Sequence, residues 1–325
     1  MKRIIVFSSM IFLTGILLTA CGSGKAEGKE DTLVAINVAD GTLDANAEFW
    51  NDAPVLDVPT VNAEDPEADG GPTIKMQAAY DDTYVYIRTE WADATESVLK
   101  NAWEWDGESF EKSGNEDRVM LVFPIQNNAE FSSQGCGAAC HNDADNTDDW
   151  YMGSDSESVT YDAWHWKAAR TGPVGYADDK WWGPQTDPDD YESSRHGDEK
   201  DGSHYSDNKN EDGNGPIYMS GVDNSSNFIF SGDEIDLDTS ILSIGDIVPG
   251  YVINRPDGSR GDIDAVGFWE NGNWVVVMRR MLNTGHDDDV VFIPPKAIPF
   301  GVSVVDDGGG LPHTVSADPI TLEWD

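Results

Sequence analysis

The pattern that most constrains the fold is the alternation of residue types in residues 74–91. Residues 74–80 (IKMQAAY) lead into Asp81-Asp82, and residues 83–91 (TYVYIRTEW) follow. Because β-branched and aromatic residues at alternating positions suit a pleated sheet, this segment predicts a β-hairpin. Further strands are expected at residues 118–124, 228–230, 273–280 and 298–305. Since few segments show helical period, the sequence predicts a mainly β fold, a β-sandwich.

Two long stretches between these strands are rich in Gly, Asp, Asn and Ser. They cover residues 131–158 and 176–215. Loops of this length are uncommon in a compact domain unless they carry function or are disordered. The first contains a Cys–His motif, described below. We expect the second to form an acidic surface excursion, with His196 and His204 exposed to solvent instead of binding a ligand.

The amino terminus has the organisation of a secretory signal. Lys2 and Arg3 form a positive region, residues 4–18 are largely apolar, and Leu18-Thr19-Ala20-Cys21 follows as a small-residue cleavage site. This ending is similar to a bacterial lipobox, in which Cys21 becomes the lipidated first residue of the mature chain. An ordinary signal peptide or a short membrane anchor is the alternative, although the apolar run is short for a span.

Cleavage before Cys21 divides the chain into three expected parts. These are a signal peptide at 1–20, a small and charged tether at 21–33, and one folded domain at 34–325. No other stretch is apolar enough to cross a bilayer. We therefore expect a lipid-anchored protein of the cell envelope that faces the periplasm or the cell exterior. Gly22 favours the outer membrane where one exists.

The chain is strongly acidic, with 61 Asp and Glu against 20 Lys and Arg, a net charge of −41. Loss of Lys2 and Arg3 with the signal leaves 18 basic against 61 acidic residues, a charge of −43. This charge argues against nucleic acid as a partner. Adaptation to a saline or cell-surface environment explains it best, and an acidic docking face for a basic redox partner is the alternative.

Residues 136–141 read Cys-Gly-Ala-Ala-Cys-His and contain both cysteines other than Cys21. Two thiols followed at once by a histidine are typical of covalent haem attachment, with Cys136 and Cys140 bound to the vinyl groups and His141 bound to the iron. The usual spacing is C-x-x-C-H, and this chain has one residue more. The motif predicts one haem c in an exported protein, outside the reducing cytoplasm.

Two other interpretations of the motif stay open. A disulfide between Cys136 and Cys140 would close a loop too short to constrain the unfolded state strongly. A zinc site would need a fourth ligand, which Asp143 or Asp145 could supply. Neither alternative explains the aromatic residues nearby, which are Trp150, Tyr151, Trp164, Trp166, Tyr176, Trp181 and Trp182. A haem is a large apolar plate that needs such walls, although ordinary packing accounts for most of them.

Residues 162–170 (DAWHWKAAR) and 175–179 (GYADD) resemble the ethylbenzene dehydrogenase-related haem-binding family. These proteins are the cytochrome subunits of dimethyl-sulfoxide-reductase-type molybdenum enzymes. Segments 74–91, 274–280 and 300–316 follow in the order expected for that family, so the resemblance covers most of residues 35–325. It implies a carbohydrate-binding-module-like or immunoglobulin-like β-sandwich with long loops that hold a haem.

The resemblance also implies an axial pair for the iron. Family members without covalent attachment bind a b-type haem through a methionine on the early hairpin and a lysine near the C-terminus. By position, the methionine is Met76, and His313 stands where the family has lysine. The histidine and the inserted attachment motif both depart from the family pattern. Met152 and His165 therefore compete with Met76 and His313 for the position opposite His141.

Among these side chains we expect Met76, because it lies on a predicted rigid strand and a thioether keeps the potential higher than a second imidazole would. An ordinary core methionine is the alternative. His165 lies between Trp164 and Trp166 on a predicted strand. Because successive side chains alternate between the faces of a strand, His165 points away from the haem if both tryptophans face it.

Together these features predict a lipid-anchored c-type cytochrome that passes single electrons to or from a redox protein partner, without enzyme activity of its own. The partner would be a molybdenum oxidoreductase or another cytochrome. A second, non-covalent haem between Met76 and His313 is the less favoured variant. The alternative function is a non-redox carbohydrate- or ligand-binding module of the same sandwich fold, with a Cys136–Cys140 disulfide. Residues 143–148 lack the glycine and terminal glutamate of an EF-hand, so no calcium loop is expected there.

Overall fold

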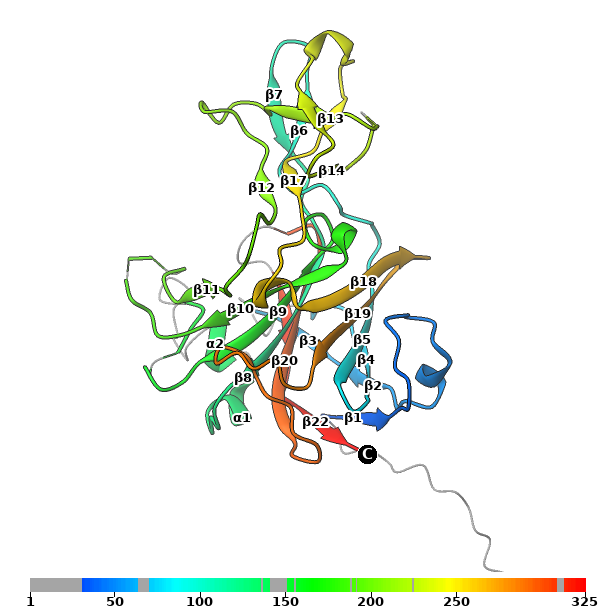
Figure 1. Cartoon of the computed structure of the whole chain (residues 1–325), viewed down its shortest axis with the longest axis vertical. Helices are drawn as coiled ribbons and strands as arrows, with labels where there is room; N and C mark the ends of the chain where they lie inside the picture. Colours follow the sequence, from blue (N-terminus) through cyan, green and yellow to red (C-terminus); the bar gives the residue numbers. More distant parts are fainter. Residues whose placement is uncertain are drawn as a thin grey trace, which may run out of the picture.

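The computed structural model describes residues 31–63, 70–135, 137–140, 151–154, 156–187, 189–190, 192–223, 225–308 and 313–325. Cys21, Cys136 and His141 lie outside these ranges, as does the predicted signal peptide, and the side chain of Cys140 is not described. Strands dominate the described chain, which confirms the predicted mainly β fold (Figure 1).

Ten strands form the body of the molecule. They are β1 (Thr32–Asn37), β4 (Ile74–Tyr80), β5 (Tyr84–Ala92), β8 (Arg118–Pro124), β9 (Tyr161–Lys167), β10 (Tyr176–Trp182), β18 (Ile263–Glu270), β19 (Asn273–Met281), β20 (Ile298–Val305) and β22 (Ile320–Trp324). Their order is β22-β1-β4-β5-β19-β18-β10-β9-β8-β20, and β20 also pairs with β22. The strands thus close into a ring with two packed faces, a sandwich with joined edges.

We call β22, β1, β4, β5, β19 and β18 the first sheet, and β10, β9, β8 and β20 the second sheet. The second sheet continues through β21 (Thr314–Ser316) to β3 (Thr60–Asn62) at one edge and through β11 (Arg195–Gly197) at the other. β2 (Leu56–Val58) pairs with β4 in the first sheet.

The core lies between the two sheets and follows the alternation of the strands. Met76 and Ala78 of β4 point into it from the first sheet, and Leu121, Phe123 and Trp164 point into it from the second. All five side chains are fully buried. Burial of a large apolar side chain contributes about 1.5–3 kcal/mol, so this layer holds the two sheets together.

The hairpin predicted at residues 74–91 is confirmed as β4 and β5, which pair antiparallel. The Asp81 side chain closes its turn, because Oδ1 accepts hydrogen bonds from the backbone N–H groups of Thr83 and Tyr84, each at 2.8 Å. The strands predicted at 118–124, 273–280 and 298–305 are confirmed as β8, β19 and β20.

The surface excursion predicted at residues 176–215 is wrong in its first part. β10 occupies Tyr176–Trp182 and joins β18 to β9 in the ring. Asp178 and Asp179 are fully buried in this strand because Lys167 and Arg280 neutralise them, and these polar residues hid the strand in the sequence. At the amino terminus, β1 begins at Thr32, two residues before the expected start of the domain.

A smaller extension projects from one end of the sandwich (Figure 1). Its strands are β6 (Ala102–Trp105), β7 (Phe110–Ser113), β12 (Ser206–Asp207), β13 (Tyr218–Ser220), β14 (Ile229–Phe230), β15 (Glu234–Asp236), β16 (Ile247–Val248) and β17 (Tyr251–Ile253). Trp103, Met219 and Val248 form its own small core. The strand predicted at 228–230 is confirmed as β14.

Helical structure is confined to short turns in the described chain. Two are α-helical, α1 (Phe131–Gln134) and α2 (Gly137–Cys140), and four are 3₁₀, η1 (Glu48–Asn51), η3 (Gly172–Val174), η4 (Thr239–Ile241) and η5 (Ser259–Gly261). Both α-helical turns fall in the first long loop of the sequence, so this loop has some structure of its own.

Candidate functional site

The segment that carries the Cys–His motif packs on the outer face of the second sheet. Ala138 and Ala139 of α2 are buried, and they belong to a cluster with Val122 of β8 and with Tyr161 and Ala163 of β9. Because the neighbours of Val122 and Ala163 along each strand point into the core, these two side chains point outward. The motif is therefore anchored against the sheet from outside the sandwich core.

Met152 lies directly beside α2. The backbone N–H of Gly153 donates a hydrogen bond to the carbonyl of Ala139 at 2.8 Å. The Met152 side chain is partly buried against the cluster that packs under α2. Its carbonyl accepts a hydrogen bond from the hydroxyl of Ser194, which ties this segment to the chain beyond β10. Met152 is one of the four side chains expected to compete as an iron ligand, and its segment is hydrogen-bonded to α2, the helix that carries part of the motif.

His165 and Met120 form a cross-strand pair on the same outer face. Met120 of β8 lies opposite His165 of β9. Trp164 and Trp166 point into the core, so the predicted opposition between His165 and the two tryptophans is confirmed. His165 is 8% exposed, and burial followed by the nearby charge of Lys167 holds its pKa well below the usual value. The imidazole is thus neutral at pH 7.

Basic side chains gather on this face although the chain as a whole is acidic. Arg195 of β11 interacts electrostatically with Arg118 of β8 and with Lys180 of β10. Burial, followed by the charge of Lys167, lowers the pKa of Lys180 to about 8. Asp178 lies 3.6 Å from Lys180 and Glu192 lies 2.5 Å from Arg195, but the three cations outnumber these two acids, which favours an anionic ligand.

Three buried N–H groups of the same face have no hydrogen-bond partner among the described residues. They are Nε of Arg118, Nε of Arg195 and Nε1 of Trp182. A buried donor without a partner costs about 1–3 kcal/mol, so it indicates a missing acceptor. Carboxylate groups such as haem propionates would supply charge and acceptors together. These residues therefore fit the cofactor that the motif predicts.

The sequence did not single out Arg118, Lys180, Arg195 or Met120. Lys180 lies in a stretch that was expected to be a loop. Arg118 and Met120 follow each other at alternating positions of a predicted strand, and this spacing places them on one face. The pattern could have indicated a polar outer surface on β8. It could not show that α2 packs on this surface, because α2 comes from another part of the chain.

The structure does not bring Met76 to the face that carries the motif. Its side chain is fully buried between the sheets. His313 lies at the edge of the second sheet, where its carbonyl accepts a hydrogen bond from the backbone N–H of Ala63 at 3.0 Å. It lines a cavity of about 250 Å³ together with Trp91, and Met76 does not line this cavity. The roles of Met76 and His313 as iron ligands stay predictions.

The two histidines of the second long loop are half-buried, whereas they were expected to be exposed. His196 stacks on Trp181 with ring centroids 4.0 Å apart. Burial, followed by the charges of Arg260 and Lys200, lowers the pKa of His204 to about 4. Ring packing and neighbouring cations therefore account for both side chains without a ligand.

Arg280 organises a separate, fully buried charge cluster. Its Nη1 lies 2.6 Å from Oδ2 of Asp162, 3.3 Å from Oδ2 of Asp179 and 3.4 Å from Oδ1 of Asp289. The guanidinium also lies 4.7 Å from the centre of the Trp164 ring. Burial alone would lower the pKa of Arg280, but the charges of Asp162 and Asp179 raise it. The cluster thus joins β9, β10 and β19 within the sandwich and has a structural role.

Among the described residues, no helix has the length and apolar character needed to span a membrane. A comparison with curated proteins gives no match.

Three solved structures match most of this chain at very low identity. A family 9 carbohydrate-binding module from Caldicellulosiruptor kristjanssonii in complex with glucose has a TM-score of 0.35 at 8% identity, over 90% of this chain and 95% of the module. The complex of such a module with cellotriose has a TM-score of 0.33 at 9% identity, over 90% and 93%. A protein from Bacteroides uniformis ATCC 8492, to which carbohydrate binding is ascribed, has a TM-score of 0.36 at 9% identity, over 91% and 99%.

A family model described as ethylbenzene dehydrogenase matches residues 47–312. The match includes the hairpin β4–β5, the motif segment and the strands of the second sheet from β8 to β20. It covers well over half of the chain, so the protein belongs to the ethylbenzene dehydrogenase family.

Proposed function

We propose that this protein is a lipid-anchored c-type cytochrome of the cell envelope that transfers single electrons. Cys136 and Cys140 would attach one haem c, and His141 would be an axial ligand. The proposal rests on one observation. The described part of the attachment segment packs on a face that carries the thioethers of Met120 and Met152, several cationic side chains, and buried N–H donors that have no partner among the described residues. Membership in the ethylbenzene dehydrogenase family is compatible with a redox role.

As a second ligand of the iron we propose Met152, with Met76 as the alternative that the sequence predicts. Met152 is hydrogen-bonded through its neighbour Gly153 to α2, whereas Met76 is enclosed by the core of the sandwich. Bound haem supplies reversible one-electron chemistry at its iron. His141 and Met152 would then both bind the iron, which suits electron transfer without a bound substrate.

The other side chains of this face would hold and tune the cofactor. Arg118 and Arg195 would donate charge-assisted hydrogen bonds to the propionates, and Trp182 would donate through its indole N–H. Tyr161 and Ala163 would supply an apolar wall. Cations near the haem stabilise the reduced, less positively charged iron, so this face would also raise the potential.

The partner in this proposal is another redox protein, a molybdenum oxidoreductase or a cytochrome. A net charge of −41 would accelerate association with a basic docking surface and would repel nucleic acid. Lipid on Cys21 would hold the domain at the membrane, facing the periplasm or the cell exterior. The residues before β1 would then serve as the tether.

Expression with a functional cytochrome c maturation system tests this proposal. We expect a red protein whose reduced form has a sharp α-band and whose redox titration follows a single one-electron step. A colourless protein with a Cys136–Cys140 disulfide that binds oligosaccharide would contradict it. That result would support the alternative of a non-redox binding module.

A further inference from the structure

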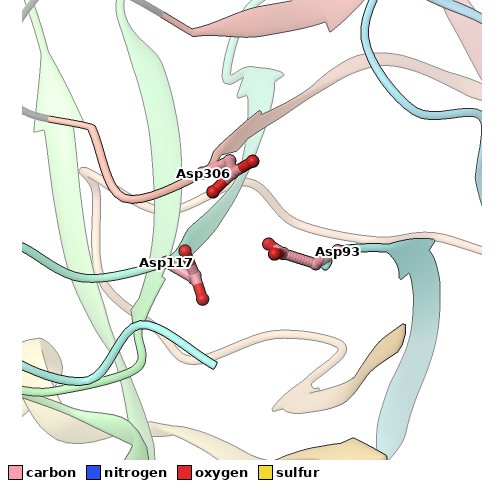
Figure 2. Close-up of side chains that lie close together, drawn as sticks. All are labelled: Asp93, Asp117 and Asp306. Carbon is pink, nitrogen blue, oxygen red and sulfur yellow. The ribbon is translucent and has the colours of Figure 1, made fainter. Parts of the chain in front are cut away.

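Three aspartates meet at one end of the sandwich, where three strands begin or finish. Asp93 follows β5, Asp117 precedes β8 and Asp306 follows β20. One carboxylate oxygen from each residue lies within 4.8 Å of the other two. Figure 2 shows the three carboxylate groups converging on a common space. Residues far apart in sequence are thus brought together by the closure of the sheets.

The spacing of these oxygens fits a single metal ion. Calcium–oxygen distances are about 2.3–2.6 Å, so two ligands on opposite sides of the ion lie about 5 Å apart. The separation of at most 4.8 Å allows all three carboxylates to reach one ion. The set contains oxygen ligands only, which favours a hard cation over zinc or copper.

Two buried oxygen atoms, from residues that line one cavity, have no hydrogen-bond partner among the described residues. They are Oδ2 of Asp93, a residue that is 4% exposed, and Oγ1 of Thr314. Both residues line the cavity of about 250 Å³, together with Asn62 and Asp306. A buried carboxylate oxygen without a partner is costly, and a cation would satisfy it. The cavity leaves room for water molecules to complete the coordination.

Asp117 differs from Asp93 because its carboxylate is already well bonded. Its Oδ2 accepts hydrogen bonds from the N–H of Ser97 at 2.7 Å and from Nε1 of Trp274 at 2.8 Å. Its Oδ1 accepts one from the N–H of Asp307 at 2.9 Å. These three bonds fix the carboxylate in place and leave one lone pair of Oδ1 for a metal. Asp117 therefore provides a rigid side of the site.

No described lysine or arginine side chain forms an ion pair with any of these three aspartates. The buried group Asp162, Asp179 and Asp289 contrasts with them, because Arg280 lies at its centre. Burial and the charges of Asp117 and Asp306 raise the pKa of Asp93 to about 6. The mutual repulsion of the three carboxylates is thus not offset by an ion pair with a lysine or arginine of the described chain.

We infer that Asp93, Asp117 and Asp306 form a calcium site that joins β5, β8 and β20. Ca²⁺ fits better than Mg²⁺, because Mg²⁺ demands near-ideal octahedral geometry, whereas Ca²⁺ accepts irregular oxygen sets with water. The bound ion would neutralise the buried charge and hold three strand ends together. This inference does not depend on the proposed haem, since none of these residues belongs to the motif face.

Calorimetric titration of the mature, chelator-treated protein with CaCl₂ at constant ionic strength tests this site. We expect one tight site per chain and a higher Tm with Ca²⁺, because a ligand that binds the folded state stabilises it. Asp306→Asn should weaken this binding by roughly tenfold or more, since ligand charge sets calcium affinity. Asp306 is exposed, so this variant should still fold. Asp93→Asn should weaken binding at least as much.

Asp212→Asn is the matched control, because Asp212 is an exposed aspartate that belongs to none of the clusters of acidic ligands in the described chain. It removes the same charge and should leave the tight site unchanged. Each of the three variants removes one negative charge, so a general effect of net charge on calcium affinity would be the same in all of them. The absence of a tight site in the unaltered protein, or unchanged affinity in Asp306→Asn, would overturn the inference.

Discussion

Met152 and Met76 differ in the surroundings of their side chains, and this difference can be tested one residue at a time. We expect Met152→Leu to abolish the sulfur-to-iron charge-transfer band of the oxidised protein and to lower its potential, because a thioether stabilises ferrous iron. Met76→Leu nearly conserves volume in the core and should cost less than about 1.5 kcal/mol of stability. Its absorption spectrum should not change. Loss of the band in Met76→Leu with retention in Met152→Leu would reverse the assignment.

Arg280 shows how a single buried cation can hold several acids in the core. Arg280→Met leaves Asp162, Asp179 and Asp289 without their partner, and we expect a loss of about 3–5 kcal/mol in the free energy of unfolding. Denaturant titration measures this loss. Arg279→Met is the control on the same strand, because the Arg279 side chain is 25% exposed and pairs with Asp264. It should cost about 1 kcal/mol or less, and equal losses in the two variants would contradict the account.

Asp93 should make the stability of the calcium-free protein depend on pH. Its pKa is raised to about 6, so the folded state binds a proton more tightly than the unfolded state does. The stability from this effect is complete below the ordinary aspartate pKa and is lost as the pH rises through about 6. With chelator present, Asp93→Asn should therefore melt higher than the unaltered protein at pH 7. The two should melt alike near pH 4, and a difference that does not vary with pH would contradict this.

At the scale of elements, the sequence predicted the strands whose apolar residues alternate. The hairpin β4–β5 and strand β8 were found because their inward side chains are apolar. β10 was missed because Asp178, Asp179 and Lys180 are charged, and the partners that allow the two aspartates to be buried, Lys167 and Arg280, lie on other strands. For the same reason the acidic and basic groups could be assigned to sites only after the strands had been placed in space.

The packing of α2 on the second sheet gives a prediction at this scale. Ala139→Asp would place a charge against the buried cluster, and we expect a loss of about 1–3 kcal/mol and a lower yield of attached haem. Ser132→Asp on α1 adds the same charge at an exposed position and should leave both unchanged. Haem absorbance per unit of protein, with thermal unfolding, measures the two effects. Equal haem content in both variants would show that the packing of α2 does not matter for attachment.

At the scale of the whole molecule, the acidic surface and the basic motif face have different consequences. The net charge of −41 promotes solubility and steers association. The basic residues on the outer face of the second sheet are largely buried, where each charge acts locally. The protein thus combines a general attraction for basic partners with one specific anion-binding face. Salt should slow association with a basic redox partner without changing the spectrum of the haem.

The central claim is that this sandwich holds a covalently attached haem at Cys136 and Cys140. Intact mass after acid–acetone extraction, together with a pyridine haemochrome spectrum, tests it most directly. We expect one haem to stay on the denatured chain with a c-type spectrum, and we expect Cys136→Ala/Cys140→Ala to lose it. A haem-free chain with a Cys136–Cys140 disulfide, produced with competent maturation machinery, would contradict the claim.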